Sequence, residues 1–451
     1  MKVPQKPPSL VQLFTEVSRE GSEKFAQVIA SQLDRKPEGS YIHWDELRHL
    51  PVPDGFTHRH WWMAIKLSRR LTHRLPFSDS KGVGFSYSVP DNLFKLLHEI
   101  DRDASGRIEV AELVTSSQTR DRYLVNSLIE ESITSSQLEG AATTYKVAKE
   151  MLRQGRKPRN HSEQMIYNNY AAMQFIRAKK SEPITPELIL QLQSTMTDET
   201  LEDDSAAGRW RRSDEDVRVV DERNHEVLHV PPPADQVTAR IEELCRFAND
   251  LHEVPFIHPL VKAIVIHFMM GWIHPFVDGN GRTARALFYW SMAKSGYWLI
   301  EFTSISRVLK KAPAQYARAY LYSETDDNDL TYFMDHQLNV ISEAIRALHA
   351  YLAEKSKEIA DTRKLIASSP KLKGKLNHRQ LAAMDHFLKH SHVIYRIQEH
   401  QNANQVTYET ARTDLLEMVD LGLLEKHREG KAFVFQMPQK LREKLAARAV
   451  N

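Results

Sequence analysis

Only one cysteine, Cys245, occurs in the 451 residues of the chain. A single thiol excludes an internal disulfide and a zinc site built on several thiolates, and it is typical of proteins of the reducing cytosol. Glycine is scarce as well, with 16 residues, and proline contributes 20. A chain with so few turn-forming residues is expected to be helical rather than rich in strands.

Neither an excess of charge nor a long hydrophobic run is present. The 61 basic and 59 acidic residues leave a formal net charge of +2, so bulk charge gives no sign of nucleic-acid binding. The most apolar stretch, residues 256–273, is interrupted by Lys262 and His267, which predicts a buried helix and not a membrane span. Residues 1–4 lead into no apolar core of a signal peptide. We therefore expect a cytoplasmic protein that does not bind membranes.

Length and local pattern predict three domains, because 451 residues are too many for one compact core. We expect an N-terminal helical domain over residues 1–120 and a central helical domain over 121–356. The last domain, residues 372–440, has short helices followed by two short strands, 424–426 and 432–435. This order is typical of a winged helix-turn-helix.

A single short hairpin is predicted within the central domain. Residues 217–219 and 227–230 are strand-like and flank a polar turn, and the prolines at 231–233 close the hairpin. The fold class we expect is therefore mainly α, with one small β-hairpin in the central domain.

The segment 273–285, IHPFVDGNGRTAR, concentrates chemically useful residues in one loop. An apolar helix must end near Pro275, and a second helix begins just after Gly281. Glycines between them let consecutive backbone N–H groups converge, which makes an anion site at a helix N-terminus. Arg282 and Arg285 are three residues apart and share a helix face, from which they can grip further phosphate oxygens.

Two other side chains of the same loop suit phosphate chemistry. Asp278 supplies a hard carboxylate oxygen of the kind that Mg²⁺ takes together with phosphates. His274 lies at the other side of the loop and can accept a proton near pH 7. An ordinary Gly-Asn turn with a loop histidine would explain any one of these residues, but not all of them at this spacing.

The segment resembles the signature of the Fic family, H-P-F-x-D-G-N-G-R-x-x-R, and matches it at every defined position. The resemblance extends over roughly residues 120–350. It implies an all-α Fic core for the central domain, with the hairpin in the place of the family's target-holding flap. It also implies transfer of AMP from ATP to Ser, Thr or Tyr hydroxyls, the reaction of most members.

The resemblance also implies a role for each motif residue. His274 would deprotonate the target hydroxyl, and Asp278 would hold Mg²⁺. Gly279, Asn280 and Gly281 would bind the phosphates of ATP. Arg282 and Arg285 would bind its β/γ end. Relatives that phosphorylate with ATP bound in reverse depart from the second half of the motif, so the intact motif here indicates nucleotide transfer.

An upstream pattern, S-x-x-x-E-G at Ser135, Glu139 and Gly140, suggests a segment that inhibits the protein's own activity. Ser135 and Glu139 lie on one helix face, and Gly140 is suited to end that helix. An exposed glutamate paired with a lysine is the simpler alternative. The pattern resembles the inhibitory helix of Fic proteins, in which the glutamate pairs with the second motif arginine, here Arg285, and competes with the γ-phosphate. This implies low basal activity, and in some relatives the same glutamate supports AMP removal.

Two weaker patterns are left open. Residues Asp101 to Glu112 have the spacing of an EF-hand Ca²⁺ loop, but no second EF-hand accompanies it, and a polar interhelical turn is favoured over calcium binding. The hairpin at 217–230 could pair with an extended target segment by strand addition, or it could be a simple surface hairpin.

The C-terminal domain invites a DNA-binding interpretation that its charges oppose. The expected recognition helix, 407–421, bears four acidic residues against Arg412, which phosphates would repel: Glu409, Asp414, Glu417 and Asp420. Basic residues of the preceding linker could compensate: Lys371, Lys373, Lys375 and Arg379. A protein-contact module is favoured slightly over DNA binding.

We therefore predict an Mg²⁺-dependent protein adenylyltransferase that uses ATP, is inhibited by its own Glu139, and modifies target proteins and itself. One alternative is transfer of another nucleotide, or AMP removal. The other is a DNA-binding regulator whose Fic-like core senses nucleotide. Homodimerisation, the target and the activating signal are left open.

Overall fold

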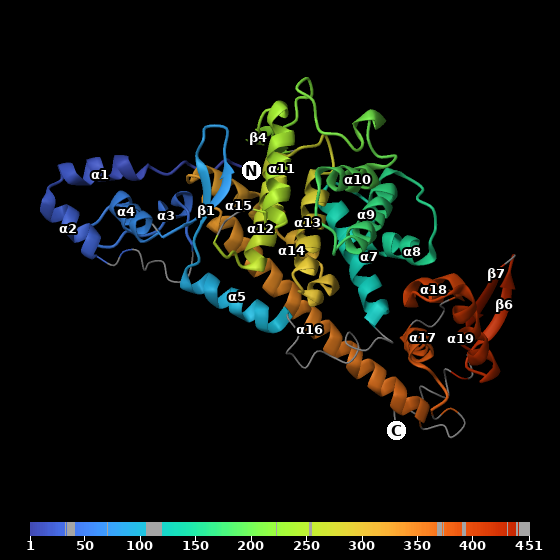
Figure 1. Ribbon diagram of the computed structural model, residues 1–451. Coiled ribbons are helices and arrows are strands. Elements are labelled where there is room, and N and C mark those ends of the chain that lie inside the picture. The colour runs from blue at the N-terminus through green and yellow to red at the C-terminus, as the bar shows by residue number, and fades with distance from the viewer. Residues whose placement is uncertain are drawn as a thin grey trace. The chain divides into compact units, whose positions relative to one another are not determined.

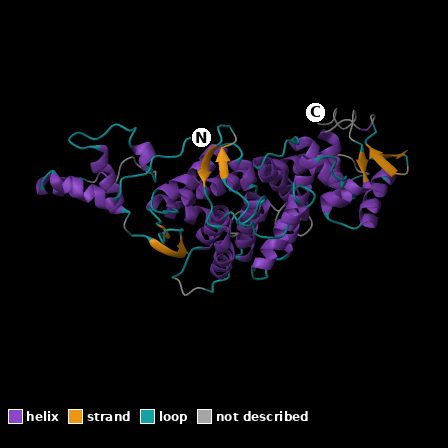
Figure 2. Ribbon diagram, turned by 90° about the horizontal axis from the view of Figure 1, so that it is seen from above, coloured by secondary structure: helices purple, strands orange, loops and turns teal. Residues whose placement is uncertain are grey.

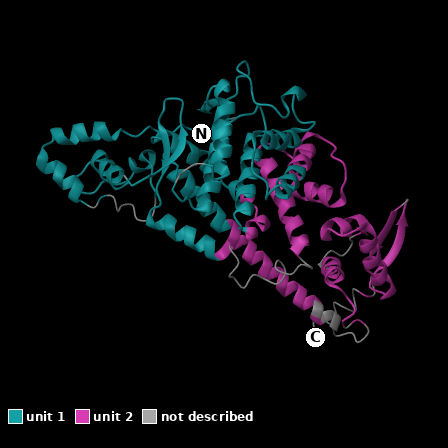
Figure 3. Ribbon diagram, viewed as in Figure 1, with its two compact units in different colours: residues 1–102, 171–297, 308–343 teal, residues 103–170, 298–307, 344–451 magenta. Residues whose placement is uncertain are grey.

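The computed structural model describes residues 1–31, 33, 41–69, 71–104, 120–221, 223–251, 255–367, 372, 374–389, 394–430, 432–438 and 441. These residues are mainly helical, as the sequence predicts, and carry three small antiparallel sheets (Figures 1 and 2). None of the helices in the described part is long and apolar enough to cross a membrane. The chain forms two compact units, 1–102 with 171–297 and 308–343, and 103–170 with 298–307 and 344–451 (Figure 3). The three-domain division stays a prediction.

The first unit begins with four short helices around an aromatic core. They are α1 Leu10–Arg19, α2 Ser22–Ala30, α3 Trp44–Leu47 and α4 His58–Ser68. Capping boxes start two of them, because Ser9 bonds the backbone of Gln12 in α1 and Thr57 bonds that of His60 in α4. Trp61 and Trp62 pack in the core of these helices.

A hairpin that the sequence did not predict follows these helices: β1 His73–Ser78 pairs with β2 Gly84–Tyr87. The predicted hairpin is present as β3 Val219–Asp221 and β4 Glu226–His229. Further helices of the first unit are α10 Pro186–Thr197, α11 Val237–Ala248, α12 Pro259–Ile273, α13 Asn280–Lys294 and α15 Pro313–Thr325, together with most of α5 Asp91–Ala104. Helices α9 His161–Ala178 and α16 Thr331–Ala367 are divided between the two units. Short 3₁₀ turns, η2 Asp204–Ala206 and η3 Ala234–Gln236, lie in the loops.

Helices α12 and α13 pack against each other at the centre of the first unit. Nearly every residue of α12 is buried, including His267, because a helix that is apolar on all sides must be surrounded by protein. This confirms the buried helix predicted for the most apolar stretch.

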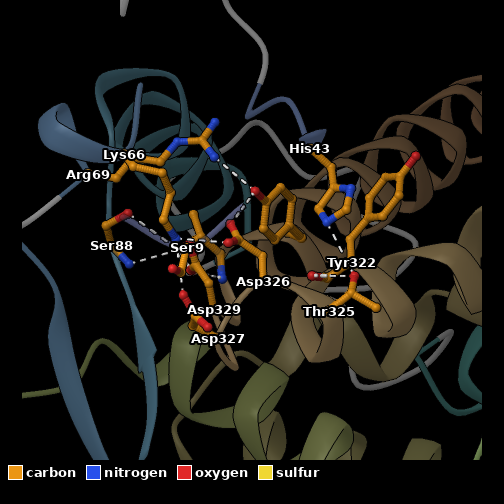
Figure 4. A network of polar contacts seen from close by, with 12 residues as sticks. Ser9, His43, Lys66, Arg69, Ser88, Tyr322, Thr325, Asp326, Asp327 and Asp329 are labelled. Atoms are coloured by element: carbon orange, nitrogen blue, oxygen red, sulfur yellow. Dashed lines mark hydrogen bonds and ion pairs between the residues drawn. The ribbon is translucent and has the colours of Figure 1, made fainter. Parts of the chain in front are cut away.

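A network of charged and hydroxyl side chains fastens the N-terminal helices to the junction of α15 and α16 (Figure 4). Lys66 of α4 donates to Asp326 at 2.8 Å. Arg69 follows α4 and lies 3.6 Å from the centre of the Tyr41 ring. The Tyr41 hydroxyl donates to Asp329 at 2.6 Å. Because these groups are buried together, their hydrogen bonds replace those lost to water.

The second unit contains α7 Arg120–Leu138 and α8 Tyr145–Gln154. It also contains η4 Trp298–Phe302 and the start of α14 Ile305–Leu309, which follow α13 in the sequence. Glu131, in the middle of α7, is buried and accepts hydrogen bonds from Ser304 at 2.8 Å and from the Ser306 backbone at 3.1 Å. These bonds fix one face of α7 against the segment after η4.

The C-terminal part of this unit has its own core. Its elements are α17 His378–Lys389, β5 Tyr395–Arg396, α18 Ile397–Asn404, α19 Tyr408–Asp420, β6 Glu425–Glu429 and β7 Ala432–Gln436, with strand order β5-β7-β6. The predicted strand pair is present, and the winged helix-turn-helix assignment stays a prediction.

Asp414 is buried in this C-terminal part of the second unit and does not lie on the exposed acidic face expected for the 407–421 helix. Its carboxylate accepts hydrogen bonds from three side chains of the same domain, Arg379 at 2.5 Å, Asn377 at 2.7 Å and His400 at 3.0 Å. Arg379 is therefore engaged by Asp414. Lys371 and Lys373, two further compensating residues of the linker, lie outside the described residues.

Candidate functional site

His274 terminates α12 in a left-handed conformation, with φ 48° and ψ 58°. Its backbone N–H donates to the Met270 carbonyl at 3.2 Å. Its ring Nδ1 lies 3.2 Å from the Gly271 carbonyl. A carbonyl oxygen can only accept, so Nδ1 carries the proton and Nε2 is the basic nitrogen of the neutral ring. The end of α12 thus selects the tautomer that a general base needs.

Asn280 shapes the loop that follows. Its side-chain oxygen accepts from the Phe276 N–H at 2.9 Å, and its side-chain nitrogen donates to the Phe276 carbonyl at 2.8 Å. Gly279 precedes α13 with φ 86°, and a Cβ there would lie 3.2 Å from the Thr197 methyl group. Glycine is therefore required both by its conformation and by the close approach of α10.

The first turn of α13 contains Asn280 and Gly281, so the free N–H groups of a 15-residue helix open on this loop. Such an end attracts anions through its N–H groups and its dipole. The structure therefore brings His274, Asp278 and the α13 N-terminus to one loop of the first unit, in the arrangement that the sequence predicts.

Arg282 is turned inward, with none of its side chain exposed. Its guanidinium donates to the Met196 carbonyl at 2.9 Å and to the Asp278 carboxylate at 2.8 Å. Arg285, one turn later, is also buried. In this conformation Arg282 holds Asp278 against the end of α10, and its predicted contact with phosphate stays a prediction.

Asp278 is the one carboxylate of the motif loop, and its side chain is 46% exposed. Among the described residues no group of three or more His, Cys, Asp or Glu side chains could hold a metal ion. One carboxylate fits Mg²⁺ when phosphate oxygens and water complete its shell. The residues present therefore suit Mg²⁺ that arrives with a nucleotide.

The predicted inhibitory segment lies at the end of α7 in the second unit. Ser135 is buried, whereas Glu139 is exposed and follows the last helical residue. Gly140 has φ 91°, which ends the helix as predicted. The pairing of Glu139 with Arg285 stays a prediction.

Arg211 is a component of the site that the sequence analysis missed. Its backbone N–H donates to the Pro275 carbonyl at 2.8 Å, and its Nε donates to the His274 carbonyl at 2.8 Å. The other end of its guanidinium reaches the carbonyls of Ile273, at 3.5 Å, and Pro232. One buried arginine thus ties both sides of the β3–β4 hairpin to the motif loop. It is one of several arginines in residues 209–223, so nothing in the local sequence distinguishes it as part of the site.

Gln193 of α10 makes a second tie of the same kind. Its side-chain nitrogen donates to the Asp278 carbonyl at 3.2 Å, and its side-chain oxygen accepts from the Gly208 N–H at 2.6 Å. The side chain is fully buried, so both of its polar ends use protein partners in place of water. The motif loop is therefore held from α10 as well as from the hairpin.

His229, the last residue of β4, was also missed. Its Nδ1 lies 2.9 Å from the Glu324 carboxylate and its Nε2 lies 2.8 Å from the Trp272 carbonyl. Burial by itself lowers the pKa of this imidazole, but the hydrogen bond and the charge of Glu324 outweigh burial, so the pKa is raised above its usual value.

The predicted Ca²⁺ loop begins inside a helix. Asp101 and Asp103 lie within α5, and Asp101 already pairs with His258 at 2.9 Å and with the Tyr297 hydroxyl at 2.5 Å. The rest of the pattern, residues 105–112, lies outside the described residues. The engaged first ligand position counts against calcium binding here.

Comparison with protein families matches residues 183–292 to the Fic/DOC family. Two similar curated proteins are named protein adenylyltransferase Fic. The Drosophila erecta protein is 35% identical and the Drosophila melanogaster protein 36% identical, each over 69 residues. Each match covers 15% of this chain and only 14% of the relative's length.

Two solved structures are also similar. A Fic family protein from Desulfovibrio desulfuricans G20 is 18% identical, with a TM-score of 0.48, over 78% of this chain and 98% of that one. Fic-1 from C. elegans is 17% identical, with a TM-score of 0.47, over 78% and 89% of the two chains.

Proposed function

Because the chain is a Fic family protein, with its Fic domain at residues 183–292, we propose that it transfers AMP from ATP to hydroxyl groups of target proteins, itself included. The observation that carries the proposal is the pairing of a correctly polarised base with an anion-binding helix end. His274 and the first residue of α13 are separated only by the motif loop.

In the proposed reaction the Nε2 of His274 accepts the proton of the target hydroxyl. The oxygen then attacks the α-phosphorus, the bond to the bridging oxygen breaks, and pyrophosphate leaves with the electron pair of that bond. The N–H groups at the start of α13 stabilise the charge on the phosphates. Asp278 would hold Mg²⁺, which when bound neutralises phosphate charge. Arg285 and Arg282 would bind the β/γ end.

Autoinhibition by Glu139 is part of the proposal. It is supported by the glutamate standing at the end of α7, followed by Gly140 that stops the helix. Substitution of Glu139 is then expected to raise activity. AMP removal, or transfer of another nucleotide, is the alternative for the same residues. A cytoplasmic location is also part of the proposal, because a single cysteine is typical of proteins of the reducing cytosol.

The test is incorporation of label from ATP labelled at the α-phosphate, compared among the wild type, Glu139→Gly and His274→Ala. Label should rise in the glutamate variant and vanish in the histidine variant. ATP labelled at the γ-phosphate is the control, because its label stays on protein only if phosphate itself is transferred. Label absent from all three proteins would contradict AMP transfer.

A DNA-binding regulator remains the second candidate, and one observation favours it more than the sequence did. The burial of Asp414 removes one acidic group from the expected recognition face. Retention on duplex DNA at physiological salt would support this candidate, and its absence would favour a protein-contact role.

A further inference from the structure

The carboxyl end of α12, which carries His274, has all four of its last carbonyls in defined hydrogen bonds. Helices leave these groups without partners inside the helix. Here the carbonyls of Met270 and Gly271 accept from the backbone and the ring of His274. The next two accept from outside, Trp272 from His229 and Ile273 from Arg211.

Both outside donors belong to the flanks of one hairpin. Arg211 precedes β3, and His229 is the last residue of β4. The segments on both sides of the hairpin are therefore hydrogen-bonded to the end of α12 that carries His274. Positive charge is favourable at this end of a helix, because its dipole is negative there.

The partners of His229 fix its charge. An ionised carboxylate on one side and a backbone carbonyl on the other can only accept hydrogen bonds, so the ring keeps both bonds only if both of its nitrogens carry protons. His229 is 8% exposed, which leaves it little access to water. A neutral ring would lose one of its two bonds.

The charged groups that face His229 are few among the described residues. Glu324 of α15 lies against it, and Arg211, from the loop before the hairpin, opposes its charge. From α12 it meets the Trp272 carbonyl and ring, and Arg240 of α11 covers that same ring at 5.2 Å. Glu324 is thus the group that balances the imidazolium.

We propose that His229, as an imidazolium, and Arg211 form a cationic clamp that fixes the β3–β4 hairpin to the end of α12 and so positions His274. Both are positioning residues, since they act on the base through the α12 carbonyls and not on the substrate. Loss of the His229 proton, as pH rises, releases the end of β4 from α12. The effect on catalysis rests on the proposed AMP transfer, whereas the clamp itself does not.

The sign of the pH effect follows from the raised pKa. The stabilisation that His229 gives to the folded hairpin is fully present below the pKa of an unfolded histidine, about 6.5, and is lost as pH rises through the higher folded value. AMP transfer should therefore fall as pH rises through the folded pKa of His229.

The charge of His229 can be measured without any activity. NMR titration of the full chain with ¹³C-labelled histidine rings would identify the His229 signal by its loss in His229→Gln. His225→Asn is the matched control, because His225 lies in the turn of the same hairpin and is exposed. The clamp predicts a His229 midpoint above about 6.5 that falls in Glu324→Gln. A midpoint at the ordinary value, unmoved by Glu324→Gln, would overturn it.

Positioning is measured as label transfer in the Glu139→Gly background. His229→Gln and Arg211→Lys should lower kcat by at least about tenfold and change the KM for ATP little, and Glu324→Gln should move the alkaline fall of kcat to lower pH. His225→Asn should change neither. Unchanged kcat in folded His229→Gln would refute positioning. If no protein incorporates label, the proposed function fails, and the NMR titration alone decides the clamp.

Discussion

Arg282 donates a 2.8 Å hydrogen bond to Asp278, four residues before it, while its own side chain is completely buried. The same guanidinium bonds the Met196 carbonyl at the end of α10. The arginine thus fixes the carboxylate that would hold Mg²⁺, and a fork of two donors is needed to reach both partners.

Arg282→Lys should therefore weaken both folding and AMP transfer. A lysine amine is a point donor and cannot serve the carbonyl and the carboxylate in the same geometry. We expect a loss of about 1.5 to 3 kcal/mol in unfolding free energy, the usual worth of a hydrogen bond to a charged group, measured by urea denaturation. Arg218→Lys, at an exposed position beside the hairpin, is the control. Equal stability of the two variants would show that the fork is unnecessary.

Gly271→Ala should disturb the base through a steric clash. A Cβ at Gly271 would lie 2.5 Å from the Tyr320 hydroxyl, and Tyr320 cannot easily move because it stacks on Phe268 and packs against Phe333. We expect destabilisation of about 1 to 3 kcal/mol and reduced label transfer, since Gly271 also holds the His274 ring.

Tyr320→Phe, combined with Gly271→Ala, offers the check on that clash. The double variant removes the closest atom, although ring carbons remain at 3.0 and 3.2 Å, so it should recover part of the lost stability. A double variant that is as unstable as the sum of both single variants would argue against a direct clash.

Tyr41→Phe should loosen the attachment of the N-terminal helices shown in Figure 4. It removes the 2.6 Å bond to the buried Asp329, whose pKa is raised by burial and by the neighbouring charge of Asp326. We expect a loss of about 1 to 3 kcal/mol, because a buried acceptor loses a partner. Tyr408→Phe, at an exposed ring, should have no effect. Thermal unfolding of both variants measures the difference.

Asp414→Ala should destabilise the C-terminal core of residues 372–441 more than any other single change considered. It leaves the buried His400 without its carboxylate and Arg379 without a partner, a loss of about 3 to 5 kcal/mol when one member of a buried pair is removed. Asp420→Ala, at an exposed position of the same helix, is the matched control. Similar urea midpoints for the two would contradict a structural role of Asp414.

The pH dependence of this domain has a definite direction. Burial alone would raise the pKa of Asp414, but the hydrogen bonds of His400, Arg379 and Asn377 hold it well below its usual range. The stabilisation is therefore fully present above about pH 4, the unfolded value, and is lost as pH falls toward the folded one. Asp414→Asn should have a flatter stability profile in acid than the wild type.

The sequence was sufficient for the fold class, for the end of α12, and for the local arrangement of His274, Asp278 and the α13 N-terminus, although α13 begins at Asn280, two residues before the predicted start. These depend on nearest neighbours along the chain: an apolar helix, a proline, glycines that permit a tight loop. The β1–β2 hairpin was not predicted, because its short strands lack a clear alternation and depend on pairing for stability.

The parts of the site that were missed depend on contacts distant in sequence. Arg211 and His274 are 63 residues apart, and His229 and Glu324 are 95 apart. No local pattern marks such pairs. The predicted exposure of Asp414 was wrong for a related reason. Its position in the helix suggested exposure, but its hydrogen-bond partners Arg379 and His400 belong to other helices, and these contacts bury it.

Cys245 of α11 is buried, and burial raises the pKa of its thiol to about 12. A thiol in that state reacts slowly with maleimides, which attack thiolates. A cysteine introduced at an exposed position, such as His225→Cys in the hairpin turn, would therefore be labelled selectively without replacing the native residue. The wild-type chain therefore needs no cysteine replacement before fluorescent or spin probes are attached, and the release of the hairpin from α12 that is proposed at high pH can be tested with them.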